Sequence, residues 1–137
     1  MSDMRATGTF EVVDFSAAPV PPSEVKTGLP VGFATMRKTF TGEIEGRSET
    51  LFTAAFDPAS STGTYVAMES FEGHVAGHPG TFNFAHSATT TGRDRQAEFL
   101  VIVQGSGTGD LTGIRGTGGL AVDEDGIHHI RFDYELS

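Results

Sequence analysis

The stretch GSGTGDLTGIRGTGG, residues 105–119, stands out because seven of its fifteen positions are glycine. It does not match a phosphate-binding P-loop, which needs a lysine followed by serine or threonine after its glycines. Gly116, Gly118 and Ala121 have the spacing of a dinucleotide-binding fingerprint, but the following VDEDGIHHIRFDYEL reads as a turn and a strand, where that fingerprint requires a helix. The glycines therefore indicate a structural role and no nucleotide cofactor.

A flexible linker is also disfavoured, because Leu111, Ile114 and Leu120 are spaced through the stretch. A Gly-x-apolar-x-Gly pattern occurs in FTGEIEG, FEGHVAG and GTGDLTG, centred on Ile44, Val75 and Leu111 and spaced 31 and 36 residues apart. In a strand, both glycines and the apolar residue of each motif would share one face. Glycine at such positions lets a strand coil sharply or a neighbouring backbone approach, as the corners of a small barrel require.

Alternating and β-branched stretches dominate the rest of the chain, and the 3.6-residue spacing of an amphipathic helix is missing from its longer segments. The breaks carry turn residues, as in DPASSTG, GHPG, TTTGRD and DEDG, and SAAPVPPSEVKTGLP predicts a surface loop. Closing the sheet into a barrel would leave no strand with an exposed edge. We therefore predict an all-β fold, a closed antiparallel eight-stranded up-and-down barrel, as a single domain over residues 1–137. The predicted strands are Met4–Phe15, Phe33–Ile44, Gly46–Phe56, Thr64–Val75, Gly80–Ala88, Ala97–Gln104, Gly107–Leu120 and Gly126–Leu136.

Composition narrows the function classes. The chain has 137 residues, no cysteine and a formal net charge of -9. It therefore has no thiolate metal site and no cysteine nucleophile, and its charge disfavours nucleic acid as a partner. The N-terminal MSDMRATGTF does not resemble a signal peptide, and no run approaches the roughly 18 apolar residues that span a bilayer. We expect a cytoplasmic protein without a membrane partner.

Alternation along the strands indicates which polar side chains share a face with apolar ones. Tyr65, Glu69 and Phe71 share one face of their strand, but the other face carries polar residues and Met68, so the inward face of this strand stays open, as does that of residues 97–104. The final strand alternates most cleanly. On it His128, Phe132 and Tyr134 share a face, and in GTFNFAHS Phe82, Phe84 and His86 share one.

Glu69 and His86 are the candidate catalytic residues. A carboxylate buried beside aromatic rings has a raised pKa, which would suit Glu69 as a general acid or base with His86 as its proton partner. The alternative is that these two groups only satisfy each other's hydrogen bonds. Candidate substrate-binding residues share the Phe-rich interior, with His128 expected at its rim: Tyr65, Phe71, Phe82, Phe84, His128, Phe132 and Tyr134.

A metal site is not predicted. His74 and His78 have a spacing that suits zinc on a helix, but glycine and proline interrupt EGHVAGHPG. The adjacent His128 and His129 point to opposite faces of a strand, so they cannot form a His-x-His pair. No cofactor is expected.

YVAMESFEGHVAGHPGTFNFAHS, VQGSGTGDLTGIRGTGGL and HHIRFDYEL together resemble a bacterial family of uncharacterised proteins, a domain of unknown function, with the allene-oxide-cyclase-like β-barrel fold. The resemblance extends from ATGTFEV to the last strand. It implies an eight-stranded barrel with a central cavity, in a superfamily that includes cyclases acting on hydrophobic substrates. Phe15 is a departure, since members of the family tend to carry tryptophan there.

Three hypotheses about function follow. The first is a cofactor-free isomerase or cyclase that acts on a hydrophobic small molecule by acid/base catalysis and substrate positioning. The second is a non-catalytic carrier or binding protein for a small apolar ligand. The third is a fully packed barrel whose outer surface mediates assembly, for example into a homo-oligomer. A structure with no cavity would exclude the first two.

Overall fold

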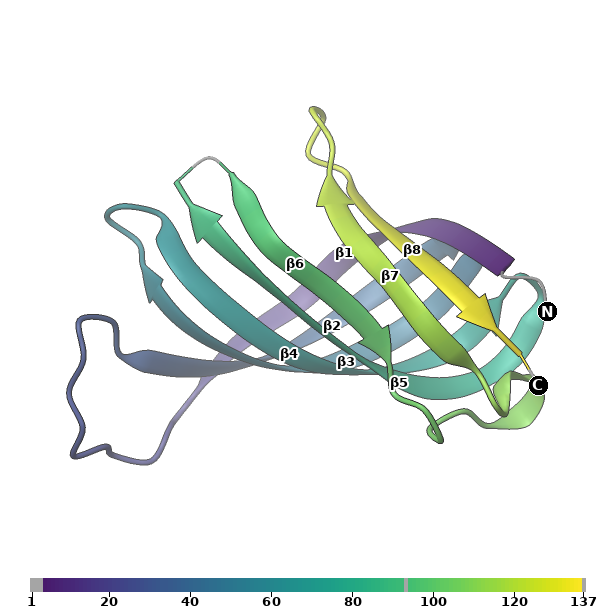
Figure 1. The fold of residues 1–137 in the computed structure, drawn as a ribbon, viewed down its shortest axis with the longest axis horizontal. Helices are drawn as coiled ribbons and strands as arrows, with labels where there is room; N and C mark the ends of the chain where they lie inside the picture. The colour runs from purple at the N-terminus through teal and green to yellow at the C-terminus, as the bar shows by residue number, and fades with distance from the viewer. Residues whose placement is uncertain (1–3, 93, 137) are drawn as a thin grey trace.

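The computed structural model describes residues 4–92 and 94–136. Eight strands form one closed antiparallel barrel, in which each strand pairs with its neighbours in sequence and β8 pairs with β1 (Figure 1). The predicted fold class is thereby confirmed. The strands are β1 (Met4–Ala18), β2 (Val31–Gly42), β3 (Ile44–Asp57), β4 (Thr62–Val75), β5 (His78–Thr91), β6 (Arg95–Ile102), β7 (Arg115–Val122) and β8 (His128–Glu135), with a short 3-10 helix, η1 (Gly109–Leu111), between β6 and β7.

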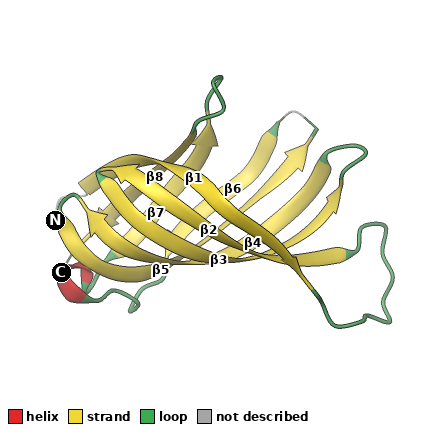
Figure 2. Ribbon diagram, turned by 180° about the vertical axis from the view of Figure 1, so that it is seen from behind, coloured by secondary structure: helices red, strands yellow, loops and turns green. Residues whose placement is uncertain are grey.

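The two ends of the barrel differ. At one end lie both termini, the tight β2–β3 and β4–β5 turns, and η1; we call this the closed end (Figure 2). At the other end the strands splay apart and the loop between β1 and β2 extends beyond the barrel (Figures 1 and 2). We call this the open end. In the described part of the chain, no helix has the length and apolar character that crossing a lipid bilayer requires.

A dense aromatic core fills the closed end. Phe132 makes edge-to-face contacts with Phe82 and Phe84, with ring centroids 5.4 and 5.3 Å apart. Such contacts add to the large hydrophobic gain from burying each ring. Phe71 and Tyr134 belong to the same buried cluster. The closed half of the barrel is thus a packed core.

The glycine-rich stretch differs from its prediction. Residues 107–114 do not extend a strand but form a loop with the 3-10 turn η1, and β7 begins only at Arg115. Gly109 and Gly113 adopt φ values of +60° and +83°, which favour glycine and break the strand. The centres of the three motifs, Ile44, Val75 and Leu111, are nevertheless all fully buried in the closed-end cluster.

Irregular positions in β1 and β6 change which side chains face inward. The register of β1 shifts between Val12 and Asp14, so that Phe15 comes opposite the inner-face Met36. In β6 the register shifts opposite β5 between Ser87 and Thr89, and Arg95 comes opposite Thr90, on the face that also carries His86. Both changes occur toward the open end, where they supply an aromatic ring and a guanidinium to the interior.

Candidate functional site

Glu69 on β4 lies at the centre of a buried polar cluster about midway along the barrel. Its Oε1 accepts hydrogen bonds from Lys38 Nζ on β2 at 3.0 Å and from His86 Nε2 on β5 at 2.8 Å, while Ser48 Oγ on β3 donates to Oε2 at 2.5 Å. Glu69 is completely buried, and Lys38 is only 4% exposed. Because a buried charge is tolerated only when it is paired, Lys38 supplies the counter-ion that keeps the Glu69 carboxylate in the interior.

The pKa of Glu69 corrects a prediction from the sequence. Burial pushes this pKa upward, but the hydrogen bond from His86, the charges of Lys38 and His86 and the hydroxyl of Ser48 outweigh burial, so the pKa lies below its ordinary value. The expected raised pKa is therefore wrong in direction, because the prediction took account of burial but not of Lys38 and Ser48 beside the same carboxylate. Glu69 is a fixed anion at neutral pH, and it accepts hydrogen bonds without donating one.

His86 and Tyr65 extend this cluster toward the open end. The ionised Glu69 can only accept, so in the neutral form of His86 the proton is on Nε2, and Nδ1 is left to accept one. The Tyr65 hydroxyl lies 2.8 Å from this Nδ1. Burial raises the pKa of the Tyr65 phenol although the Arg95 guanidinium pulls it down, and Arg95 Nη2 lies 3.5 Å from the phenolic oxygen. Glu69, His86 and Tyr65 thus form a continuous hydrogen-bonded chain, which we call the Tyr65 relay.

The Tyr65 relay ends at two connected hollows on the inner side of the barrel. Lys38, Tyr65, His86 and His128 are among the residues that line a small pocket of about 160 Å³. A larger apolar groove of about 560 Å³ runs to the open end. The two share Phe52, Tyr65 and Arg95, so an apolar molecule in the groove would meet the phenol of Tyr65. The groove is lined mainly by small and aromatic residues: Phe15, Ala17, Pro30, Gly32, Phe33, Ala34, Phe52, Ala54, Phe56, Gly63, Tyr65, Thr90 and Arg95.

The candidate residues from the sequence fall into two groups. The structure places Tyr65, His86 and His128 in the lining of the pocket, with the His128 ring stacked on Phe10 at 5.0 Å, and Glu69 is buried behind them, bonded to His86. The remaining five belong to the closed-end core and are at most 2% exposed, which leaves a ligand no surface to contact: Phe71, Phe82, Phe84, Phe132 and Tyr134.

Sequence analysis missed Lys38, Ser48, Arg95 and the aromatic lining of the groove. Counting back by twos from the buried Phe40 places Lys38 on the inner face, so its signal was present in the alternation. Phe15 and Arg95 carried no such signal, because a bulge lies between each of them and the regular part of its strand and reverses the alternation. Within residues 4–92 and 94–136, no group of three His, Asp or Glu side chains is placed to hold a metal ion.

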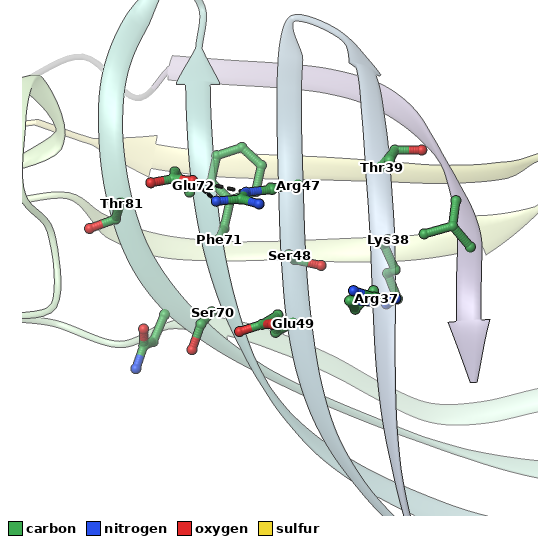
Figure 3. Close-up of a pocket in the computed structure, with 12 residues that line it drawn as sticks. Arg37, Lys38, Thr39, Arg47, Ser48, Glu49, Ser70, Phe71, Glu72 and Thr81 are labelled. Carbon is green, nitrogen blue, oxygen red and sulfur yellow. Dashed lines mark hydrogen bonds and ion pairs between the residues drawn. The ribbon is translucent and has the colours of Figure 1, made fainter. Parts of the chain in front are cut away.

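A further hollow, of about 540 Å³, lies on the outer face of β2–β5 (Figure 3). Arg47 and Glu72 form an ion pair across it at 2.9 Å, and Arg37 lies 3.6 Å from Asp14. These side chains are largely exposed, and exposed pairs of this kind contribute little free energy. The buried and connected groups are those of the inner side, so the candidate site lies there.

Comparison with known proteins agrees with this architecture. The family model described as "Protein of unknown function (DUF3224)" matches residues 6–134. A crystal structure of a protein with unknown function from the DUF3224 family of Shewanella oneidensis MR-1 is 29% identical, with a TM-score of 0.85, and the match covers 99% of this chain and 98% of that one. No curated protein matches the chain. The chain therefore belongs to the DUF3224 family, the uncharacterised bacterial family that its sequence resembles.

Proposed function

We propose that this protein is a cofactor-free isomerase or cyclase that binds a hydrophobic small molecule in the open-end groove and moves a proton at Tyr65. The observation that carries this proposal is the Tyr65 relay, which connects a buried carboxylate to a phenol at the edge of an apolar groove. Catalytic sites commonly combine an apolar hollow with a few convergent polar groups.

The proton transfer balances without an external reactant. Tyr65 takes a proton from an acidic carbon of the substrate while its own phenolic proton passes to Nδ1 of His86. The imidazolium that forms is stabilised by Glu69, which already holds Nε2 at 2.8 Å. The reverse transfer returns a proton to a different atom of the substrate. Arg95, beside the phenolic oxygen, stabilises negative charge that develops there or on a substrate carbonyl oxygen.

Glu69 holds a different role here from the one that its sequence suggested. A carboxylate with a lowered pKa is a poor general acid, but it orients His86 and favours the protonated imidazole in the transition state. Tyr65 is then the residue that touches the substrate, and His86 exchanges protons with it. Lys38 keeps the cluster close to electrical neutrality before the proton moves.

Exchange of carbon-bound protons tests the proposal without knowledge of the natural substrate. The apolar ketone 2-tetralone has acidic protons next to its carbonyl, and their replacement by deuterium in heavy water is followed by NMR. The wild-type protein should accelerate this exchange, and Tyr65→Phe should reduce the acceleration by about a hundredfold or more. Tyr134→Phe is the matched control, since Tyr134 is buried in the closed-end core. Equal exchange by Tyr65→Phe and the wild type would refute the proposed role of Tyr65.

One observation favours a carrier as the second candidate function. The groove is open to solvent, with Phe15 57% and Phe56 47% exposed, which suits exchange of an apolar ligand better than the sheltering of a reactive intermediate. A carrier would bind 2-tetralone or a similar molecule without accelerating proton exchange. The same NMR samples therefore distinguish the two functions.

A further inference from the structure

The barrel is incompletely sealed between β6 and β7. Only Val101 with Thr117 and Ile102 with Gly116 pair across this junction in the described residues, although both strands are 8 residues long. Toward the open end β6 and β7 diverge (Figure 1). We call the part bordered by residues 96–100 and 118–122 the open seam.

Local backbone features account for the open seam. Ala97 has a φ of +52°, a left-handed conformation that costs an L-residue about 1–2 kcal/mol, and it lies where β6 loses its regular register with β5. On the facing strand, Gly119 carries no side chain that could fill the space, and the nearest atoms to an added Cβ there are those of the Arg131 guanidinium. Strain that persists at one position beside a candidate site points to a role for the conformation it maintains.

The open seam contains a hollow of about 240 Å³ whose lining residues come from both faces of the barrel wall. Tyr65 and Leu120 line it from the inner side, while Phe99 and Arg131 line it from strand positions that face outward. Arg95 lines this hollow and also the groove and the small pocket. The groove and the hollow at the open seam thus meet at Tyr65 and Arg95, which line both.

Two of the charged groups at the open seam are the guanidinium groups of Arg95 and Arg131, which can donate more hydrogen bonds than their ion pairs use. Arg95 Nε lies 3.5 Å from Glu98, and Arg131 Nε lies 2.8 Å from Asp133. Each guanidinium has five N–H groups, so these contacts leave further donors free to bind a ligand. Both ion pairs are partly exposed, and such pairs exchange partners at little cost.

We propose that the open seam binds the hydrogen-bond-accepting end, such as a carboxylate, of an elongated ligand whose apolar body lies in the groove. This inference rests on the proposed function, since it assigns the ligand class of the same site. Tyr65 would then contact the middle of the ligand rather than its end. The open seam determines the length and polarity of the molecules that bind.

Two fluorescent probes of different length test this inference. 1-Aminoanthracene is short enough for the groove alone, whereas cis-parinaric acid is an elongated polyene with a terminal carboxylate. Gly119→Leu places a side chain at the open seam, where the nearest atoms to an added Cβ are the movable guanidinium atoms of Arg131, 3.1–3.4 Å away. Thr117→Leu is the control, because Thr117 is an exposed β7 residue in the paired part of the junction.

Wild-type protein should bind both probes. Gly119→Leu should weaken the binding of cis-parinaric acid about tenfold and should change the affinity for 1-aminoanthracene by no more than about twofold. The Thr117→Leu control should keep both affinities within about twofold of the wild-type values. Arg131→Met should remove the preference for cis-parinaric acid over its methyl ester. Equal affinity of Gly119→Leu and the wild type for cis-parinaric acid, or an unchanged acid preference in Arg131→Met, would overturn the open-seam site and leave the groove standing. Failure of the wild type to bind 1-aminoanthracene would overturn the groove, and the open-seam site with it.

Discussion

Lys38 and Glu69 form an ion pair that is almost completely withdrawn from water, with side-chain exposures of 5% and 0%. Moving two charges out of water is costly, and well-packed apolar residues of similar volume commonly stabilise a protein as well or better. Stability alone therefore gives no reason to place such a pair inside a barrel. A carboxylate that holds His86 in one orientation does give a reason, and the pair is best understood as part of the Tyr65 relay.

Lys38→Met should destabilise the protein by about 3 kcal/mol, because it leaves the Glu69 anion buried without its counter-ion. Lys38→Met combined with Glu69→Gln should recover a substantial part of that loss, since both charges are then gone. Urea unfolding of the wild type, the two single variants and the double variant gives the coupling free energy directly. Strictly additive losses would show that the two side chains do not depend on each other.

The lowered pKa of Glu69 predicts a specific loss of stability in acid. A carboxyl whose pKa is lower in the folded state contributes stability that is present above its ordinary pKa, about 4.3, and is lost as pH falls through the lower folded value. The stability advantage of the wild type over Glu69→Gln should therefore shrink as pH falls below about 4. Thermal unfolding of both proteins across this range measures the difference, and the other carboxyls cancel because both proteins contain them. A difference that stays constant down to pH about 3 would contradict a charged, paired Glu69.

At the scale of strands, the two bulges decide what the open end contains. They turn Phe15 and Arg95 toward the interior, whereas uninterrupted alternation in β1 and β6 would turn both outward. Phe15 joins the groove, with its ring 6.2 Å from that of Phe52, and Arg95 reaches the hydroxyl of Tyr65. The chemistry at the open end therefore depends on backbone irregularity and not on residue type alone.

Ala97→Gly should stabilise the protein by about 1 kcal/mol, because glycine adopts the left-handed conformation of Ala97 without the steric cost of a Cβ atom. Ala85→Gly is a suitable control. Ala85 is paired regularly with Met68 and Val101 in β5, where glycine should destabilise the strand by about 0.5–1 kcal/mol. Urea unfolding measures both changes, and a loss of stability in Ala97→Gly would argue against strain at the β6 bulge.

The same irregularities separate what the sequence could predict from what it could not. Alternation and turn residues predicted eight strands in the right order, and they placed Glu69 and His86 together, because side chains two residues apart share a face wherever a strand is regular. Arg95 lies beyond a bulge that no residue pattern marks. The loop with η1 replaces the first part of the predicted strand Gly107–Leu120, because Gly109 and Gly113 take positive φ values. The phenylalanines were correctly expected inside, but burial alone does not distinguish a packed core from the lining of a pocket.

At the scale of the whole molecule, the two ends of the barrel differ in role: one stabilises the fold and the other offers a groove. The closed end contains the aromatic core that stabilises the fold, and the open end contains exposed rings around the groove. The hypothesis of a fully packed barrel, drawn from the sequence, thus applies only to the closed half of the molecule. Exposed aromatic side chains gathered in one hollow mark a binding surface more often than a structural feature.

This division predicts opposite effects for the same substitution at the two ends. Phe132→Ala removes a ring that is 0% exposed and should destabilise the protein by about 3–5 kcal/mol, through lost burial and a new cavity. Phe15→Ala and Phe56→Ala remove rings that are about half exposed, and each should cost less than about 1 kcal/mol. The two open-end variants should nevertheless weaken 1-aminoanthracene binding about threefold or more, because the probe loses an aromatic wall of the groove. Thermal unfolding and fluorescence titration of the same samples provide both measurements. If Phe15→Ala and Phe56→Ala instead lowered stability as much as Phe132→Ala and left probe affinity unchanged, the open end would be part of the core and the groove would have no role in binding.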